Sequence, residues 1–200
     1  MGAFADASVS NEKKDHCRAL VLSGGGSNGA WEAGVLWGFL HYGNPEDFAY
    51  DVVSGISAGS LNAIALAGTP VGTEKVVSQA ISDLWMNLKT SDVWKHWTIP
   101  IVEGFFNKAG LVDNSPLLAW LTNITSKSPD FQRRTVLQTT NVNTGEITIF
   151  NQDNLEWKDA AKAGVSSASI PGIFPPFIWD DGRLFMDGGS IRNVNTLSAI

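Results

Sequence analysis

The sequence predicts an α/β fold built around a parallel β-sheet. In the first half of the chain, short apolar strands alternate with helices, as they do in βαβ units. Two strand-to-helix junctions are rich in glycine, at Gly24–Gly29 and at Gly55–Gly59. Of the 200 residues, 44% are hydrophobic and 17% are charged, a composition that can bury a sizeable core. We therefore expect one globular domain over residues 18–200, preceded by a polar, flexible N-terminal arm over residues 1–17.

Five elements are expected in the first half. Residues 18–22 form a short apolar run that is typical of a buried strand. Residues 31–41 carry apolar side chains at helical spacing, and residues 50–54 indicate a second strand. Residues 61–67 are rich in small side chains and end before a glycine and a proline, which indicates a short helix. A longer helix is expected over residues 74–89.

The second half is predicted to contain a hairpin, a helix and a last strand. Residues 135–140 and 146–150 are joined through Asn-Thr-Gly at 143–145, a turn signal between two strands. Small residues over 159–167 indicate a helix. The apolar run at 183–186 indicates the final strand.

The composition limits the classes of partner and compartment. Lys and Arg number 14 against 20 Asp and Glu, and the net charge of −6 argues against nucleic-acid binding. No apolar run reaches the roughly 18 residues of a transmembrane segment. The single cysteine, Cys17, excludes an intrachain disulfide and a multi-cysteine metal site, and we expect it to be buried. Because no secretory signal stands at the start, we expect a cytoplasmic protein, or a secreted or lysosomal one if a leader has been removed.

The stretch from Gly55 to Gly59 has the pattern GxSxG and lies between the second strand and the following helix. A serine in this context occupies a sharp, strained turn that exposes its oxygen at the end of the sheet. The N–H groups of the helix that follows favour negative charge developing beside it. We therefore expect Ser57 to be a nucleophile and Gly55 and Gly59 to form its elbow.

The glycine loop after the first strand offers backbone N–H groups to a negative charge. Gly24, Gly26 and Gly29 also match the GxGxxG pattern of dinucleotide-binding folds. That pattern requires an acidic residue at the end of the second strand, whereas Asp51 lies at its start. We therefore expect the loop to hold the oxyanion of a substrate attacked by Ser57, with a dinucleotide as the less favoured alternative.

A serine nucleophile needs a proton acceptor, and the late chain offers a carboxylate rather than a histidine. The three histidines lie at positions 16, 41 and 96, far from the late strand. Asp187 follows that strand and precedes two glycines, while Asp180 and Asp181 are expected in an exposed turn. These residues alone leave two roles open for Asp187: a base, or a carboxylate that only accepts backbone hydrogen bonds in a tight turn.

One aromatic stretch, residues 93–106, has no clean helical or strand period. It contains Trp94, Trp97, Phe105 and Phe106. Aromatic side chains dominate cores as well as binding sites. The stretch therefore either packs in the core or borders an acyl pocket or a lipid-facing rim.

Three motifs in this order resemble the patatin-like phospholipases. They are the glycine loop at Gly24–Gly29, the GxSxG turn at Gly55–Gly59 and the sequence Asp187-Gly188-Gly189, and they are accompanied by the similar stretches GAWEAGVL, GLVDNSPL, NTGE and SSASIPGIFPP. The resemblance extends from about Leu20 to Asn193. It implies a three-layer α/β/α sandwich with a mostly parallel central sheet.

The resemblance also implies an activity, that of a lipid acyl hydrolase of the phospholipase A or lysophospholipase type. It makes Ser57 the nucleophile, Asp187 the base, and Gly24, Gly25 and Gly26 the oxyanion hole. No histidine, metal or cofactor is implied. The implied partner is a lipid or membrane surface that carries the substrate.

Two positions depart from the family pattern. Asn28 stands where the family usually has a basic residue, and Asn195 stands where it often has proline. The chain also ends 13 residues after Asp187, over residues 188–200, so we expect a fragment or a shortened form. A catalytically weak or inactive storage or binding protein of the same fold is the alternative, and the intact Ser57 and Asp187 speak against it.

Overall fold

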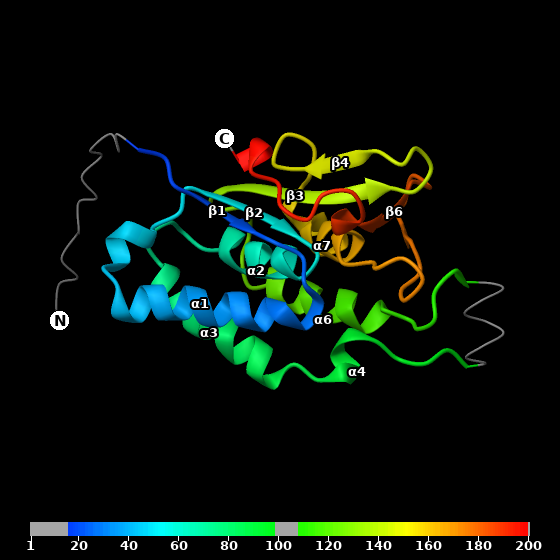
Figure 1. Cartoon of the computed structure of the whole chain (residues 1–200), viewed down its shortest axis with the longest axis horizontal. Helices are drawn as coiled ribbons and strands as arrows, with labels where there is room; N and C mark the ends of the chain where they lie inside the picture. The colour runs from blue at the N-terminus through cyan, green and yellow to red at the C-terminus, as the bar shows by residue number, and fades with distance from the viewer. Residues whose placement is uncertain (1–15, 99–107, 200) are drawn as a thin grey trace, which may run out of the picture.

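The structure is a computed structural model that describes residues 16–98 and 108–199 (Figure 1). Its strands are β1 (Ala19–Leu22), β2 (Val52–Ile56), β3 (Arg134–Asn141), β4 (Ile147–Phe150), β5 (Phe177–Ile178) and β6 (Leu184–Asp187). Its α-helices are α1 (Gly29–Tyr42), α2 (Ala58–Ala67), α3 (Glu74–Asn87), α4 (Thr90–Val93), α6 (Ser115–Thr125) and α7 (Ala160–Ser167). Short 3₁₀ helices are η1 (Gly26–Asn28), η2 (Pro45–Phe48), η4 (Trp157–Asp159), η5 (Gly188–Ser190) and η6 (Leu197–Ala199).

The strands form one sheet in the order β1-β2-β3-β6-β5, with β4 also pairing with β3. The pairs β1–β2 and β2–β3 are parallel, and the pairs made by β4, β5 and β6 are antiparallel. Strand β2 pairs with the first part of β3 and ends with Ile56 opposite Gln138. Strand β6 pairs with the last part of β3 and ends with Asp187 opposite Thr139. The ends of β2 and β6 therefore meet at adjacent positions of β3.

One face of the sheet is covered by helices. Helices α2 and α7 contact β3, and α2 also packs on β2. Figure 1 shows both helices beneath the sheet, with α1, α3 and α6 further from it. The hydrophobic core lies between these layers and includes Val53, Ile64, Leu121, Leu137 and Val165.

The other face of the sheet carries the chain that follows Asp187. The 3₁₀ helix η6 contacts β1 and β2. The side chain of Gln138 donates hydrogen bonds to the carbonyl oxygens of Gly188 at 3.0 Å and Arg192 at 2.8 Å. Gly188 lies so close to β3 that a Cβ on it would collide with the carbonyl oxygen of Gln138. Helical segments thus lie on both faces of a sheet in which β1, β2 and β3 run parallel, which confirms the predicted α/β class.

Most predicted elements agree with the structure to within a few residues. Three further elements of the structure, α4, α6 and β5, were not predicted from the sequence. The expectation for Cys17 was wrong: its side chain is exposed, because it lies in irregular chain before β1. Residues 1–15 of the expected arm lie outside the described residues.

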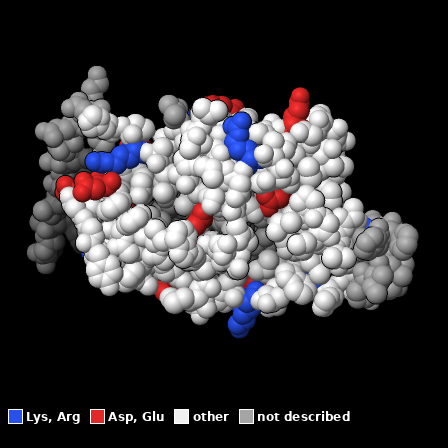
Figure 2. Space-filling view, viewed as in Figure 1, with Lys and Arg blue, Asp and Glu red and all other residues white. Residues whose placement is uncertain are grey.

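The surface carries few charged side chains on the face shown in Figure 2, and they are scattered rather than gathered into one patch. Within the described ranges, no helix is both long enough and apolar enough to cross a bilayer.

Candidate active site

Ser57 lies on the tight turn between β2 and α2. Its φ angle is +53°, a conformation that residues other than glycine rarely adopt. A Cβ on Gly59 would lie 2.6 Å from the carbonyl oxygen of Ser23, and a Cβ on Gly55 would collide with the carbonyl oxygen of Gly59. Strand and helix therefore approach each other closely enough to require both glycines. This is the strained turn that the GxSxG pattern predicts.

The backbone of Ser57 is held on both sides by buried serines. Its N–H donates to Oγ of Ser167 at 2.8 Å, and that hydroxyl donates to the carbonyl oxygen of Gln138 at 2.7 Å. The carbonyl oxygen of Ser57 accepts from Oγ of Ser60 at 2.6 Å. These bonds offset part of the cost of the strained turn and leave the Ser57 side chain to be used elsewhere.

Asp187 meets Ser57 because of the register of β2 and β6 on β3. The Ser57 side chain lies beside the Asp187 carboxylate on the wall of one groove and acts to lower the pKa of that carboxyl. The N–H of Gly189 donates to Asp187 Oδ1 at 2.7 Å. The exposed fractions are 5% for Ser57 and 7% for Asp187, so both side chains are shielded from bulk water. The structure thus brings together Ser57 and Asp187, the two residues that the family resemblance pairs.

The environment of Asp187 changes its protonation. Burial raises the pKa of this carboxyl above its ordinary value, while the hydrogen bonds from Ser57 and Gly189 act in the opposite direction. A carboxylate with a raised pKa is a stronger proton acceptor than a free one. A carboxylate in this environment can accept a proton from a neighbouring hydroxyl.

The glycine loop passes next to Ser57, and its backbone N–H groups differ in whether they already have a hydrogen-bond acceptor. The N–H of Gly24 donates to Oδ1 of Asn193 at 3.0 Å, and Nδ2 of Asn193 donates to the Gly24 carbonyl oxygen at 3.0 Å. Within the described residues, the N–H groups of Gly25 and Gly26 have no acceptor. Gly26 has a φ of +57°, which glycine adopts readily. Of the three expected oxyanion donors, Gly25 and Gly26 are therefore the available ones in this arrangement.

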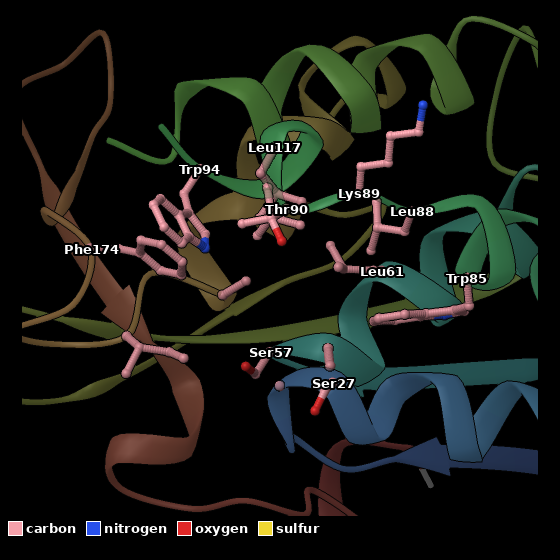
Figure 3. A pocket seen from close by; sticks show the side chains of 15 residues that line it. Ser27, Ser57, Leu61, Trp85, Leu88, Lys89, Thr90, Trp94, Leu117 and Phe174 are labelled. Carbon is pink, nitrogen blue, oxygen red and sulfur yellow. The ribbon is translucent and has the colours of Figure 1, made fainter. Parts of the chain in front are cut away.

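Two cavities flank Ser57. An apolar cavity of about 310 Å³ is lined by residues that include Leu61, Trp85, Trp94, Leu117 and Phe174. Figure 3 shows Ser57 at the edge of this cavity, with the apolar side chains around the space next to it and the Lys89 ammonium pointing away from Ser57.

A more open groove of about 480 Å³ lies on the other side of Ser57. It is lined by Gly24, Gly25, Gly26, Asp187 and Asn193, among others. Both the cavity and the groove include Ser57 and Gly26, so an extended molecule can cross the serine from one to the other.

The aromatic stretch at 93–106 contributes in part to the apolar cavity. Val93 and Trp94 line it, whereas the indole of Trp97 donates to the carbonyl oxygen of Gly110 at 3.0 Å. Phe105 and Phe106 lie outside the described residues.

Other candidate groups lie away from Ser57. His96 packs edge-on against Trp94, with ring centroids 5.1 Å apart, and no histidine is among the side chains that line the cavity or the groove. Asp51 accepts a hydrogen bond from the N–H of Arg18, before β1 and at the opposite end of the sheet from the glycine loop. A carboxylate placed there cannot bind a ribose at the loop, so the dinucleotide alternative is not supported. No cluster of three or more His, Cys, Asp or Glu side chains suited to a metal ion occurs in residues 16–98 or 108–199.

Three residues that hold the site carry no recognisable signal in the sequence. Ser167 and Asn193 fix Ser57 and Gly24, and Glu32 accepts the N–H of Ser23 at 2.8 Å, just before the glycine loop. Each of these contacts joins residues that are distant in the chain or on different elements, so no local pattern reports them.

The chain matches a known protein-family model over most of its length. The family model described as patatin-like phospholipase matches residues 20–200, which include both Ser57 and Asp187. The chain belongs to the patatin-like phospholipase family. Membership supports a lipid acyl hydrolase activity in general terms.

Two individual relatives share only low sequence identity with the chain. A lysophospholipase NTE1 from Scheffersomyces stipitis is 26% identical over 184 residues, covering 88% of this chain. The chain spans only 10% of that relative's length. Among solved structures, VipD from Legionella pneumophila matches with a TM-score of 0.54 and 15% identity, over 92% of this chain and 48% of that one. This likeness concerns the fold of the patatin-like domain.

Proposed function

We propose that this patatin-like domain hydrolyses carboxylic esters of lipids through an acyl-enzyme on Ser57. The observation that carries the proposal is the placement of Ser57 and the buried Asp187 side by side, at the ends of β2 and β6 and on the wall of one groove. The pair lies between an apolar cavity and a loop with two free backbone donors. The phospholipase A or lysophospholipase type of reaction fits a site of this kind.

In the first half of the reaction, Oγ of Ser57 attacks the ester carbonyl carbon and its proton passes to Asp187. The N–H groups of Gly25 and Gly26 donate to the oxyanion that forms. When the tetrahedral intermediate collapses, the bond to the alcohol breaks and the alcohol takes the proton from Asp187. The products of this half are the free alcohol and an ester on Ser57.

In the second half, Asp187 accepts a proton from a water molecule whose oxygen attacks the acyl carbon. The oxyanion is again held by the glycine loop. Collapse releases the fatty acid, and the proton on Asp187 returns to Oγ of Ser57. One carboxylate therefore serves as base and acid in turn, which requires it to be close to both oxygens rather than strongly basic.

The two cavities orient the substrate. The apolar cavity suits the acyl chain, because burying each methylene contributes about 0.8 kcal/mol. The groove beside Asp187 suits the alcohol, which must receive its proton from that carboxyl. The leaving alcohol and the acyl chain then lie on opposite sides of Ser57.

The test is a hydrolysis panel over lipid classes with the wild-type protein and Ser57→Ala. Mass spectrometry after treatment with an organophosphonate that reacts with active serines provides an independent readout. We expect release of fatty acid and labelling at Ser57, both lost in Ser57→Ala. A wild-type protein that is folded, cleaves no ester in the panel and is not labelled would favour the inactive binding protein.

A further inference from the structure

Glu32 makes an unusual set of contacts directly behind the glycine loop. It lies in the first turn of α1 and folds back toward the end of β1. Its Oε1 accepts from the N–H of Ser23 at 2.8 Å and from Oγ of Ser23 at 3.1 Å. Because Ser23 immediately precedes Gly24, this carboxylate fixes the point at which the loop leaves the sheet.

The second oxygen of Glu32 joins the carboxylate to helix α2. Oε2 accepts from Nδ2 of Asn62 at 3.3 Å, and the same Nδ2 donates to the carbonyl oxygen of Gly29 at 3.0 Å. Oδ1 of Asn62 accepts from the indole Nε1 of Trp85 at 2.7 Å. An indole N–H can only donate, so Trp85 fixes the orientation of the Asn62 amide and turns its NH₂ group toward Glu32.

The contacts of Glu32 are all with donors. In the part of the chain that the structure describes, no ion pair involves Glu32. Burial raises its pKa, and the hydrogen bonds from Ser23 and Asn62 oppose that rise. A partly buried carboxylate without a cation is a costly group for packing alone. The Glu32 carboxylate instead provides two acceptor oxygens, one for Ser23 after β1 and one for Asn62 on α2.

We propose that Glu32 is a positioning residue for the oxyanion loop, held in register by Asn62 and Trp85. The inference rests on the proposed function, since it assigns the Gly25 and Gly26 N–H groups to the oxyanion. Trp85 lines the acyl cavity and also packs on Gly29, where a Cβ would collide with its ring. The relay Trp85–Asn62–Glu32–Ser23 therefore connects the wall of the acyl cavity to the base of the loop.

The informative substitution is Glu32→Gln, which keeps the shape and removes one acceptor. In either orientation of the new amide, its NH₂ group faces a donor, at Ser23 or at Asn62. We expect kcat for a soluble short-chain ester to fall about 10- to 100-fold, because small displacements of an oxyanion donor are costly. The KM, and the Kd of a non-hydrolysable ether analogue of the ester, should stay within about twofold.

A second substitution separates positioning from general destabilisation. In the double variant Glu32→Gln with Asn62→Asp, the new carboxylate accepts from both Trp85 and Gln at position 32, although the Gly29 carbonyl oxygen loses its donor. We expect kcat to recover at least about threefold relative to Glu32→Gln alone, as coupled neighbours do. Glu146→Gln, on an exposed hairpin turn, is the control for the loss of one negative charge.

The outcomes are distinguishable. If wild-type protein hydrolyses the ester and folded Glu32→Gln keeps its kcat, or loses kcat and ligand affinity in parallel with Tm, the positioning role is wrong. If Glu32→Gln fails to fold, Glu32→Asp tests the same point, since its shorter side chain cannot reach Ser23 and Asn62 together. A wild-type protein without esterase activity would instead overturn the proposed function. Faster hydrogen exchange of the Ser23 amide in Glu32→Gln would still report whether the carboxylate holds that group.

Discussion

Asn193 forms two hydrogen bonds with the backbone of one residue, Gly24. Its Oδ1 accepts from the Gly24 N–H and its Nδ2 donates to the Gly24 carbonyl oxygen, both at 3.0 Å. The residues are 169 positions apart in the chain. Since Asn193 lies six residues after Asp187, the pair ties the segment that bears the candidate base to the loop that bears the candidate oxyanion donors.

Replacing Asn193 with Ala should impair turnover more than folding. The two bonds are solvent-exposed, and a hydrogen bond contributes only about 0.5–1.5 kcal/mol to stability, so the variant should fold. Because the bonds hold the glycine loop in place, we expect kcat for a soluble ester to fall about tenfold. Asn193→Asp should lower kcat further, because it adds a negative charge beside the oxyanion. The control is Arg192→Gln, whose side chain is exposed one residue away. Unchanged kcat in folded Asn193→Ala would contradict a role for the pair.

The elements around the site were predictable because their signals are local. The predicted strand at 50–54 and helix at 61–67 correspond to β2 and α2, and the GxSxG pattern marks the turn between them. Asp187 is a candidate because it stands at the end of a strand and before two glycines, and its role as the base is what the family resemblance implies. Its contact with Ser57 depends on the register of β2 and β6 on β3, which no local pattern contains.

Other parts of the fold could not be predicted from the sequence for physical reasons. Helix α6 is an exception, because its buried residues Leu117, Leu121 and Thr125 recur every four positions and a proline stands in its first turn. The sequence therefore carries a helical signal there that the prediction missed. Strand β5 has only two residues and exists through its pairing with β6. The bonds from Glu32 to Ser23 and from Asn193 to Gly24 arise only when distant elements pack together.

The strained backbone of Ser57 predicts opposite trends in stability and activity. Ser57→Gly should raise the free energy of unfolding by about 1 kcal/mol, because glycine adopts a positive φ without strain. Ser57→Ala keeps the strain and should have near wild-type stability. Both variants should lack esterase activity and organophosphonate labelling. Urea unfolding of the three proteins checks the order, and a Ser57→Gly variant no more stable than Ser57→Ala would show that the turn is relaxed.

The apolar cavity predicts a chain-length effect at Trp94. Trp94→Ala removes a half-buried wall, so kcat/KM for long-chain esters should fall about tenfold while short-chain esters change by less than about twofold. Trp37, on α1 and not among the side chains that line the cavity, provides the matched control as Trp37→Ala. Equal losses for both ester lengths, together with a lower Tm, would show that Trp94 serves core packing instead.

The environment of Asp187 predicts the shape of the pH profile. The base must be ionised, and burial raises its pKa, so kcat/KM should fall as the pH drops through a value higher than the ordinary pKa of an aspartate. Asp187→Asn should abolish turnover because an amide cannot accept the Ser57 proton. Changing His16, His41 and His96 together to Gln should leave the acid limb in place. Loss of activity through His96→Gln alone, with Asp187→Asn active, would overturn the dyad.

The same raised pKa predicts a stability change of defined sign. A carboxyl whose pKa is higher in the folded protein than in the unfolded chain costs no stability while both forms are protonated. It destabilises the folded state progressively as the pH rises through the folded-state value. Asp187→Asn removes that cost, so its Tm should exceed the wild-type Tm at pH 8, and the difference should shrink toward acidic pH. Thermal unfolding of both proteins across this range is the measurement. If Asp187→Asn is instead less stable, and increasingly so as the pH rises, the bonds from Ser57 and Gly189 stabilise the ionised form by more than burial costs.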